Sequence, residues 1–162
     1  MKAGETQFVN FLNQNQQLII PVYQRTYSWG ISQCRQLWED LMKVIKNNTE
    51  AHFIGSIVYV SDGLYVNTET QSYLVIDGQQ RLTTISLLFL AIRDRLKNNT
   101  NFSVNERQIT NQFLTNEFAL QDKKNKLCLT QGDKVIFEKL LNSQKAEESE
   151  KQNKIWLNYN YF

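Results

Sequence analysis

The sequence lacks any apolar run of the roughly 18 residues that a membrane-spanning helix requires. Its longest run, Ile85 to Ile92, contains Ser86 and is followed directly by charged residues. No apolar segment with a small-residue cleavage site follows Met1, so no signal peptide is predicted. We therefore expect a cytoplasmic protein that has no membrane partner.

Cysteine, histidine and proline are scarce, with two, one and one residues respectively. Cys34 and Cys128 lie far apart, and neither belongs to a Cys-x-x-Cys or Cys/His cluster. Each is interpreted as a buried structural thiol. The single histidine, His52, is a candidate general base, but a lone histidine at the start of a strand is more often structural.

The sequence also lacks an excess of either charge, since 18 basic residues stand against 16 acidic ones. The two signs are mixed in both halves of the chain, so no basic stripe of the kind that coats a DNA-binding face is present. Charge therefore gives no argument for nucleic-acid binding. What is present is 162 residues with 41% hydrophobic content, enough for the core of one globular domain.

Apolar periodicity predicts an α/β (α+β) fold in which a small mixed β-sheet is surrounded by helices. A short helix capped by Thr6 carries the first aromatic residues. The predicted strands are Leu18 to Ile20, Phe53 to Val60, Leu64 to Val66 after an Asp62-Gly63 turn, and Ser72 to Ile76. The longer predicted helices begin after Ser32, at Gln79, at Glu106 and at Asp133.

The composition of the sequence changes beyond Lys97, where a polar stretch is followed by residues whose apolar periodicity is mostly helical. This change predicts a core over residues 1–100 and a helical extension over residues 101–162. The final segment, from Ile155 to Phe162, is apolar and aromatic up to the last residue. We expect a chain truncated before a further domain.

The strongest local signal for chemistry is an apolar strand that ends in Asp77-Gly78 and passes directly into a helix. The first-turn amides of such a helix, at Gln79 and Gln80, point beyond the strand end and suit an anion. Arg81 adds a fork of donors, and the Thr83 hydroxyl is close in sequence. Asp77 is predicted to hold a divalent cation or to orient Arg81. The alternative is a simple strand-to-helix turn with Asp77 as a cap.

A second cluster interleaves aromatic residues with Gln24 and Arg25 in the loop after the first strand. Tyr23 and Tyr27 are candidates for stacking on a base while Arg25 contacts phosphate. The alternative is that these rings, and Trp29 above all, are core residues that fix the loop. In a third segment, the glycine within Phe53-Ile54-Gly55-Ser56 is predicted to mark close approach of a ligand to the backbone.

These three segments resemble, in order and approximate spacing, the N-terminal domain of GmrSD-type modification-dependent restriction enzymes. The matching strings are Pro21 to Trp29, Phe53 to Ile57 and Ile76 to Thr84, and the similarity continues to the terminal Asn158-Tyr159-Asn160-Tyr161-Phe162. The resemblance implies a ParB/sulfiredoxin-like core with a nucleotide pocket. It places Asp77, Gly78, Gln79, Gln80 and Arg81 at the phosphate end, with Gln24 and Arg25 facing them and Gly55 on the neighbouring strand.

The resemblance further implies a domain that binds and hydrolyses a nucleoside triphosphate in a restriction or phage-defence protein. Mg²⁺ is expected near Asp77, with Asp77 and Arg81 as the catalytic residues. A single histidine cannot supply a His-Asn-His nuclease motif, so DNA cleavage is expected from a missing C-terminal domain or a partner subunit. Two other hypotheses stay open: a non-catalytic module that binds DNA or a modified base in the same pocket, and a degenerate member with a structural role.

Overall fold

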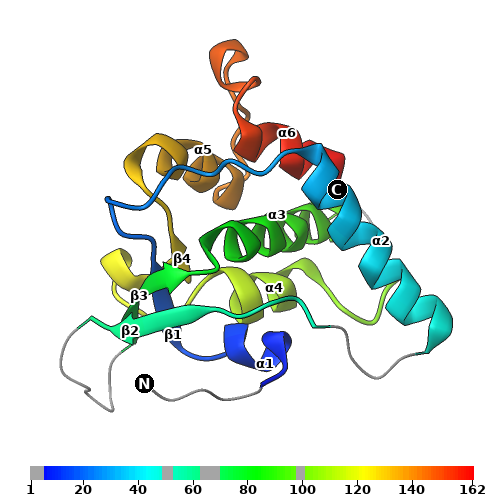
Figure 1. Cartoon of the computed structure of the whole chain (residues 1–162), viewed down its shortest axis with the longest axis horizontal. Coiled ribbons are helices and arrows are strands. Elements are labelled where there is room, and N and C mark those ends of the chain that lie inside the picture. Colours follow the sequence, from blue (N-terminus) through cyan, green and yellow to red (C-terminus); the bar gives the residue numbers. More distant parts are fainter. Residues whose placement is uncertain (1–5, 49–52, 63–69, 98–100) are drawn as a thin grey trace.

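The computed structural model describes residues 6–48, 53–62, 70–97 and 101–162. In these ranges the helices are α1 (Phe8–Leu12), α2 (Ile31–Asn47), α3 (Gln79–Leu96), α4 (Glu106–Ile109), α5 (Gln131–Leu141) and α6 (Lys154–Tyr161). The strands are β1 (Gln16–Ile19), β2 (Val58–Ser61), β3 (Gln71–Asp77) and β4 (Leu127–Cys128). The predicted α+β class with a small mixed sheet is confirmed (Figure 1).

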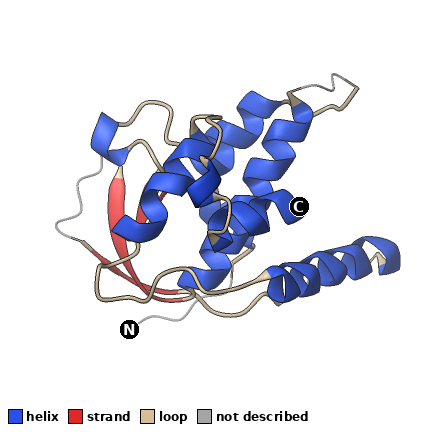
Figure 2. Ribbon diagram, turned by 90° about the horizontal axis from the view of Figure 1, so that it is seen from above, coloured by secondary structure: helices blue, strands red, loops and turns tan. Residues whose placement is uncertain are grey.

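The four strands form one mixed sheet in the order β2-β3-β1-β4. β1 lies parallel to β3, with Leu18 opposite Tyr73, and parallel to β4, with Ile19 opposite Cys128. β2 is antiparallel to β3 and forms the other edge. Figure 2 shows the strands gathered on one side of the molecule, with the helices beside them. The carboxyl ends of the parallel strands therefore meet where α3 and α5 begin.

Helix α3 is the central element of the fold, and most of its residues are buried. A helix that is apolar around most of its circumference is typical of a protein interior. Leu82, Leu87 and Leu90 are at most 1% exposed. Phe89 stacks on Phe113 from the segment after α4, with ring centroids 4.2 Å apart. Figure 1 shows α5 and α6 on one side of α3 and α4 on the other.

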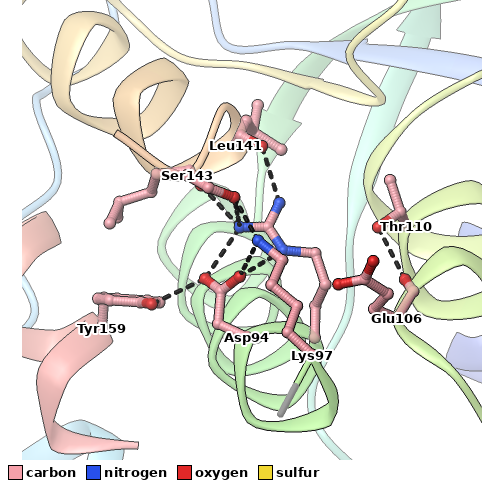
Figure 3. Close-up of polar contacts among 9 residues, drawn as sticks. Asp94, Lys97, Glu106, Thr110, Leu141, Ser143 and Tyr159 are labelled. Carbon is pink, nitrogen blue, oxygen red and sulfur yellow. Dashed lines mark hydrogen bonds and ion pairs between the residues drawn. The ribbon is translucent and has the colours of Figure 1, made fainter. Parts of the chain in front are cut away.

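A buried polar network fastens the C-terminal half of α3 to α5 and α6 (Figure 3). The Arg93 guanidinium donates to the backbone carbonyls of Leu140, at 2.7 Å, and Leu141, at 2.8 Å. These carbonyls belong to the last turn of α5, which has no intrahelical donors for them. Asp94 pairs with Arg93 at 2.9 Å and accepts a hydrogen bond from the Tyr159 hydroxyl at 2.8 Å. α3 thus caps the end of α5 and holds α6.

This network also shifts two pKa values. Burial disfavours the charged carboxylate of Asp94, but hydrogen bonds from Arg93, Lys97 and Tyr159 outweigh burial and lower its pKa. Burial, followed by the hydrogen bond to Asp94, raises the pKa of Tyr159 to about 12. Asp94 is therefore an ionised structural anchor at neutral pH.

Residues from both predicted halves of the chain share one sheet and one core. β4 pairs with β1, and Lys126 donates from its ammonium to the carbonyl of Leu12 at 2.9 Å. One buried apolar cluster includes Leu18, Leu82, Phe137 and Ile155. The division at residue 100 stays a prediction, and the second half contributes a strand as well as helices.

Several predicted boundaries are wrong. The side chain of Thr6 does not cap α1, whose N-cap is Gln7, and α2 starts at Ile31 because Gly30 is its N-cap. The strand expected over Phe53 to Val60 is confined to Val58–Ser61. The helix from Glu106 continues as a π-helix only to Leu114, leaving Phe118 96% exposed.

Two further predictions concern other parts of the chain. The strand expected over residues 64–66 and His52 lie outside the described residues. No helix in the described ranges is long and apolar enough to cross a membrane.

Candidate functional site

The three sequence segments meet around the N-terminus of α3. The Gln24 side chain donates to the carbonyl of Ile76 at 3.0 Å, which ties the loop after β1 to the end of β3. The Arg81 guanidinium donates to the carbonyl of Ser56 at 2.6 Å, which ties the segment before β2 to α3. Segments separated by more than twenty residues in the chain therefore lie together at this helix end, as the family resemblance implies.

The side chain of Gln80 holds the loop in place. Its Oε1 accepts hydrogen bonds from the backbone N–H of Ser28 at 2.8 Å and of Trp29 at 3.2 Å. Its Nε2 donates to the carbonyl of Thr26 at 3.3 Å. The side-chain amide is thus used within the protein, and the backbone N–H is the group that Gln80 can offer to a ligand.

Tyr27 is a core residue rather than a stacking platform. It is 6% exposed, and its hydroxyl accepts from Asn158 at 2.8 Å and lies 2.7 Å from Thr84 Oγ1. Thr84 itself donates to the carbonyl of Gln80, so Tyr27 is the donor to Thr84. Burial is the main cause that raises the pKa of Tyr27 above its usual range. The base-stacking prediction is corrected here, because a buried ring has no free face for a base.

Tyr23 and Arg25, in contrast, are exposed. Tyr23 is 71% exposed, which leaves its ring free to stack. Arg25 lines a small pocket and makes no ion pair with any described residue. Trp29 is half-buried and packs against the core, as the structural interpretation of this residue predicts.

Gly55 is required by the guanidinium of Arg81. Its φ is +97°, in the region that favours glycine, and a Cβ here would lie 2.6 Å from Nε and 2.7 Å from Cζ of Arg81. The prediction that a ligand approaches Gly55 is therefore corrected, because the group against this glycine is the side chain of Arg81. Gly78 has φ +92° and forms the N-cap of α3, and a Cβ there would lie 3.0 Å from the carbonyl oxygen of Ser56.

Asp77 is exposed at the end of β3 and does not cap α3. The N-cap is Gly78, and no side chain of the described residues makes a cap hydrogen bond to this helix. The first intrahelical hydrogen bond runs from Leu82 N to Gly78 O, so the amides of Gln79, Gln80 and Arg81 have no intrahelical acceptor. The simple capping alternative for Asp77 is thereby wrong, and the first-turn amides of α3 have no acceptor among the residues that the structure describes.

A small pocket lies beside this helix end, between the first turns of α3 and α5. It is lined by Ile20, Arg25, Tyr27, Gln79, Gln80, Thr83, Leu129, Thr130 and Asp133. Its cavity volume is about 10 Å³, about the space of one water-sized sphere. The Thr83 hydroxyl donates back to the carbonyl of Gln79 at 2.9 Å, which leaves its oxygen lone pairs as acceptors.

The predicted residues fall on two sides of α3. Successive helical residues are about 100° apart, so Arg81 projects roughly 200° away from Gln79. Gln79, Gln80, Thr83 and Arg25 line the pocket, whereas Arg81 lies against Gly55 on the other side. The free amides of the helix end lie between these two groups.

Sequence reasoning missed Asp133 as a site residue. It lies in the first turn of α5, is 6% exposed, and accepts from the backbone N–H of Tyr27 at 2.6 Å through Oδ2. Burial raises its pKa, while the hydrogen bond from Tyr27 acts in the opposite direction. A carboxylate directly after Thr130-Gln131-Gly132, at the start of an apolar helix, was the available signal.

No group of three or more histidine, cysteine or acidic residues is placed to hold a metal ion within the described ranges. A metal enclosed by protein ligands alone is therefore not built from these residues. Both cysteines are free thiols; the predicted burial is confirmed for Cys34, whereas Cys128 is only partly buried.

Comparison with known proteins gives a match to one family model. The family model of the GmrSD restriction endonuclease N-terminal domain matches residues 8–162. A search of the curated proteins found no match. The family match spans all three segments that meet at α3 and continues through α6. The chain therefore belongs to the family of the GmrSD restriction endonuclease N-terminal domain.

Proposed function

We propose that this chain binds a nucleoside triphosphate at the N-terminus of α3 and acts as the nucleotide-hydrolysing regulatory domain of a restriction or phage-defence protein. The observation that carries the proposal is the convergence of three sequence segments on this helix end. There, unpaired backbone amides are flanked by two guanidinium groups, those of Arg25 and Arg81. Membership of a restriction-endonuclease domain family supports the regulatory context.

The helix end suits phosphate for two independent reasons. An α-helix carries partial positive charge at its N-terminus, and its first amides are donors without intrahelical partners. α3 is 18 residues long and is held by a buried core, so its amides are fixed in direction. A phosphate chain lying across this end would meet the amides of Gln79 and Gln80 between Arg25 and Arg81.

The carbonyl of Ser56 orients Arg81 for this role. One nitrogen of the guanidinium donates to that carbonyl, and the group has further N–H donors for a phosphate. An arginine fixed by such a contact loses less conformational freedom when it binds an anion. Gly78, at φ +92°, allows the backbone to turn into the helix while it packs closely against Ser56 and Ile57.

The residues present fit Mg²⁺ that arrives with the nucleotide. Mg²⁺ is usually bound through one or two carboxylates together with substrate phosphates. Asp77 is an exposed carboxylate at the helix end, without a hydrogen-bond or ion-pair partner among the described residues, and is the residue that would hold the ion. The ion would neutralise phosphate charge, while Asp77 and Arg81, as the proposed catalytic residues, position the phosphates.

One observation favours a second candidate function, the binding of DNA or a modified base without catalysis. Tyr23 is 71% exposed and adjacent in sequence to the Gln24-Arg25 pair. An exposed ring beside a cation is a typical stacking platform for an unpaired base. DNA would then be recognised here, and cleavage would come from a further domain or a partner nuclease.

The deciding experiment is titration of the purified chain with ATP, GTP, CTP and UTP, each with and without Mg²⁺, by calorimetry. Release of phosphate is measured on the same samples. Saturable, Mg²⁺-dependent binding of at least one nucleotide is the expected result. Binding of single-stranded DNA without any nucleotide binding would favour the second function, and absence of both would contradict the proposal.

A further inference from the structure

Two side-chain oxygen atoms on the pocket wall have no hydrogen-bond partner among the described residues. Gln79 is 8% exposed, and its Oε1 is buried and unpaired. Asp133 is 6% exposed and uses Oδ2 to accept from Tyr27, whereas Oδ1 has no partner in the described part of the chain. Both residues line the pocket between the first turns of α3 and α5.

Buried polar atoms without partners are rare because each costs free energy that a hydrogen bond would recover. Besides Oε1 of Gln79, the buried side-chain oxygens without a partner among the described residues are those of Asn116 and Asn158. The amide nitrogens of those asparagines each make two hydrogen bonds, so their positions are explained by the fold. Neither lines the pocket, whereas Gln79 does.

The shape of the pocket limits what can satisfy these oxygens. A cavity of about 10 Å³ admits a single small group and excludes a ring. Ile20 and Leu129 contribute apolar walls, so a group that enters leaves bulk water. A carboxylate and an amide oxygen are both acceptors, so the entering group must be a donor.

The charges at the pocket point to a ligand with two different ends. Arg25, also on the pocket lining, makes no ion pair with Asp133 or with any other described residue. A molecule that carries both an anionic group and an O–H or N–H donor would satisfy both side chains. A nucleotide has this chemistry, with phosphates at one end and ribose hydroxyls or a base amine at the other.

We propose that Asp133 and Gln79 form the specificity end of the nucleotide site, where they accept hydrogen bonds from one small donor group of the ligand. This inference rests on the proposed function. The group is a hydroxyl or a primary amine, which are the donors of this size on a nucleotide. Asp133 thereby contributes to ligand selection from a helix that sequence reasoning did not assign to the site.

The test uses Asp133→Asn and Gln79→Met in the full chain. The introduced asparagine keeps an oxygen for the Tyr27 amide and replaces the pocket-facing acceptor by a donor, so the fold is retained. The introduced methionine keeps the backbone amide for phosphate and replaces the side-chain amide, with its unpaired oxygen, by an apolar group of similar length. Glu138→Gln, on the solvent-facing side of the same helix α5, is the matched charge control, since Glu138 does not line the pocket.

We expect Asp133→Asn to weaken binding of the preferred nucleotide by about ten- to a hundredfold, and Gln79→Met by about three- to tenfold, with Glu138→Gln unchanged. The 2′-deoxy and 3′-deoxy forms of that nucleotide, and an analogue without the exocyclic amine, identify the donor. The form that lacks it binds wild type more weakly and is less affected by Asp133→Asn.

Two results separate failure of this inference from failure of the proposed function. If wild type binds nucleotide and both pocket variants bind it equally well while folded by circular dichroism, the specificity role of Asp133 and Gln79 is overturned and the phosphate site stands. If wild type binds no nucleotide, both proposals fail. Equal weakening of every nucleotide form by Asp133→Asn would also overturn the inference, because selection requires a difference between forms.

Discussion

Substitution of Gly55 by alanine tests whether the guanidinium of Arg81 can keep its position only because residue 55 has no Cβ. Two costs are expected. A non-glycine residue at φ +97° costs about 1–2 kcal/mol. The added Cβ would lie 2.6 Å from Nε of Arg81, so the guanidinium must move away from the carbonyl of Ser56. Loss of that partly exposed hydrogen bond adds about 1 kcal/mol.

The two costs can be separated in a double-mutant cycle with Arg81→Ala. In the Arg81→Ala background the three atoms nearest to the new Cβ are absent, so the backbone cost of about 1–2 kcal/mol is what we expect to stay. We therefore expect Gly55→Ala to lower the free energy of unfolding by about 2–3 kcal/mol in wild type and by about 1 kcal/mol less in Arg81→Ala. Urea denaturation followed by tryptophan fluorescence gives both values.

The control is Gly132→Ala, at a glycine in the first turn of α5. A Cβ there would lie 3.7 Å from Cγ2 of Thr26, an ordinary contact. Alanine is favoured over glycine in a helix, so this variant should be neutral or slightly stabilising. Equal costs of Gly55→Ala in the two backgrounds would refute the reasoning, since the clash with Arg81 would then contribute nothing.

Four other predictions address the site and its support. Arg81→Ala should lower nucleotide affinity about ten- to a hundredfold, whereas Arg35→Ala, on helix α2, should leave it unchanged in the same titration. Asp77→Asn should leave the melting temperature unchanged, because Asp77 caps no helix, and should reduce Mg²⁺-dependent binding and phosphate release; unchanged turnover would leave Asp77 without a catalytic role. Gln80→Ala should lower the free energy of unfolding by about 1–3 kcal/mol, because it removes the acceptor of the part-buried backbone amides of Ser28 and Trp29. Burial raises the pKa of the Cys34 thiol from 9.0 to about 11, so the folded state holds this proton more tightly than the unfolded state does. The stability that this proton contributes is complete below pH 9 and is lost as the pH rises to 11. Over that interval the difference in unfolding free energy between wild type and Cys34→Ala should shrink by up to about 3 kcal/mol.

The elements with strong periodicity could be predicted from the sequence. Apolar residues recur through Leu82 to Ile92, and α3 forms there because this pattern buries most of the helix. The strand expected over Phe53 to Val60 failed in its first half. Gly55 at positive φ and the carbonyl of Ser56, which serves Arg81, interrupt the extended backbone, and neither constraint is visible without the distant Arg81 side chain.

The sequence predicted which residues lie at the candidate site better than it predicted what each side chain does there. The helix start was recognisable from the strand-to-helix turn, which leaves backbone amides without intrahelical acceptors. Near that N-terminus of α3 lie the predicted residues Gln24, Arg25, Gln79 and Arg81. The role of Gln80 depends on hydrogen bonds to a loop more than fifty residues away, so local spacing could not assign it. Asp133 could be placed at the start of a helix but not at the site, because the contact of α5 with the loop is set by packing of the whole fold.

Helices α3 and α5 run in the same direction, and the side chain of Arg93 joins them at their C-terminal ends, away from the pocket. Arg93, which holds the last carbonyls of α5, is 14 residues beyond Gln79, or about 21 Å along the axis of α3. The two helices are therefore joined at their C-terminal ends, and the distance between their N-terminal ends sets the width of the pocket. A change in the contacts of Arg93, or of α6 through Tyr159 and Asp94, would alter the angle between α3 and α5. It would thereby move Asp133 although none of these residues contacts the ligand.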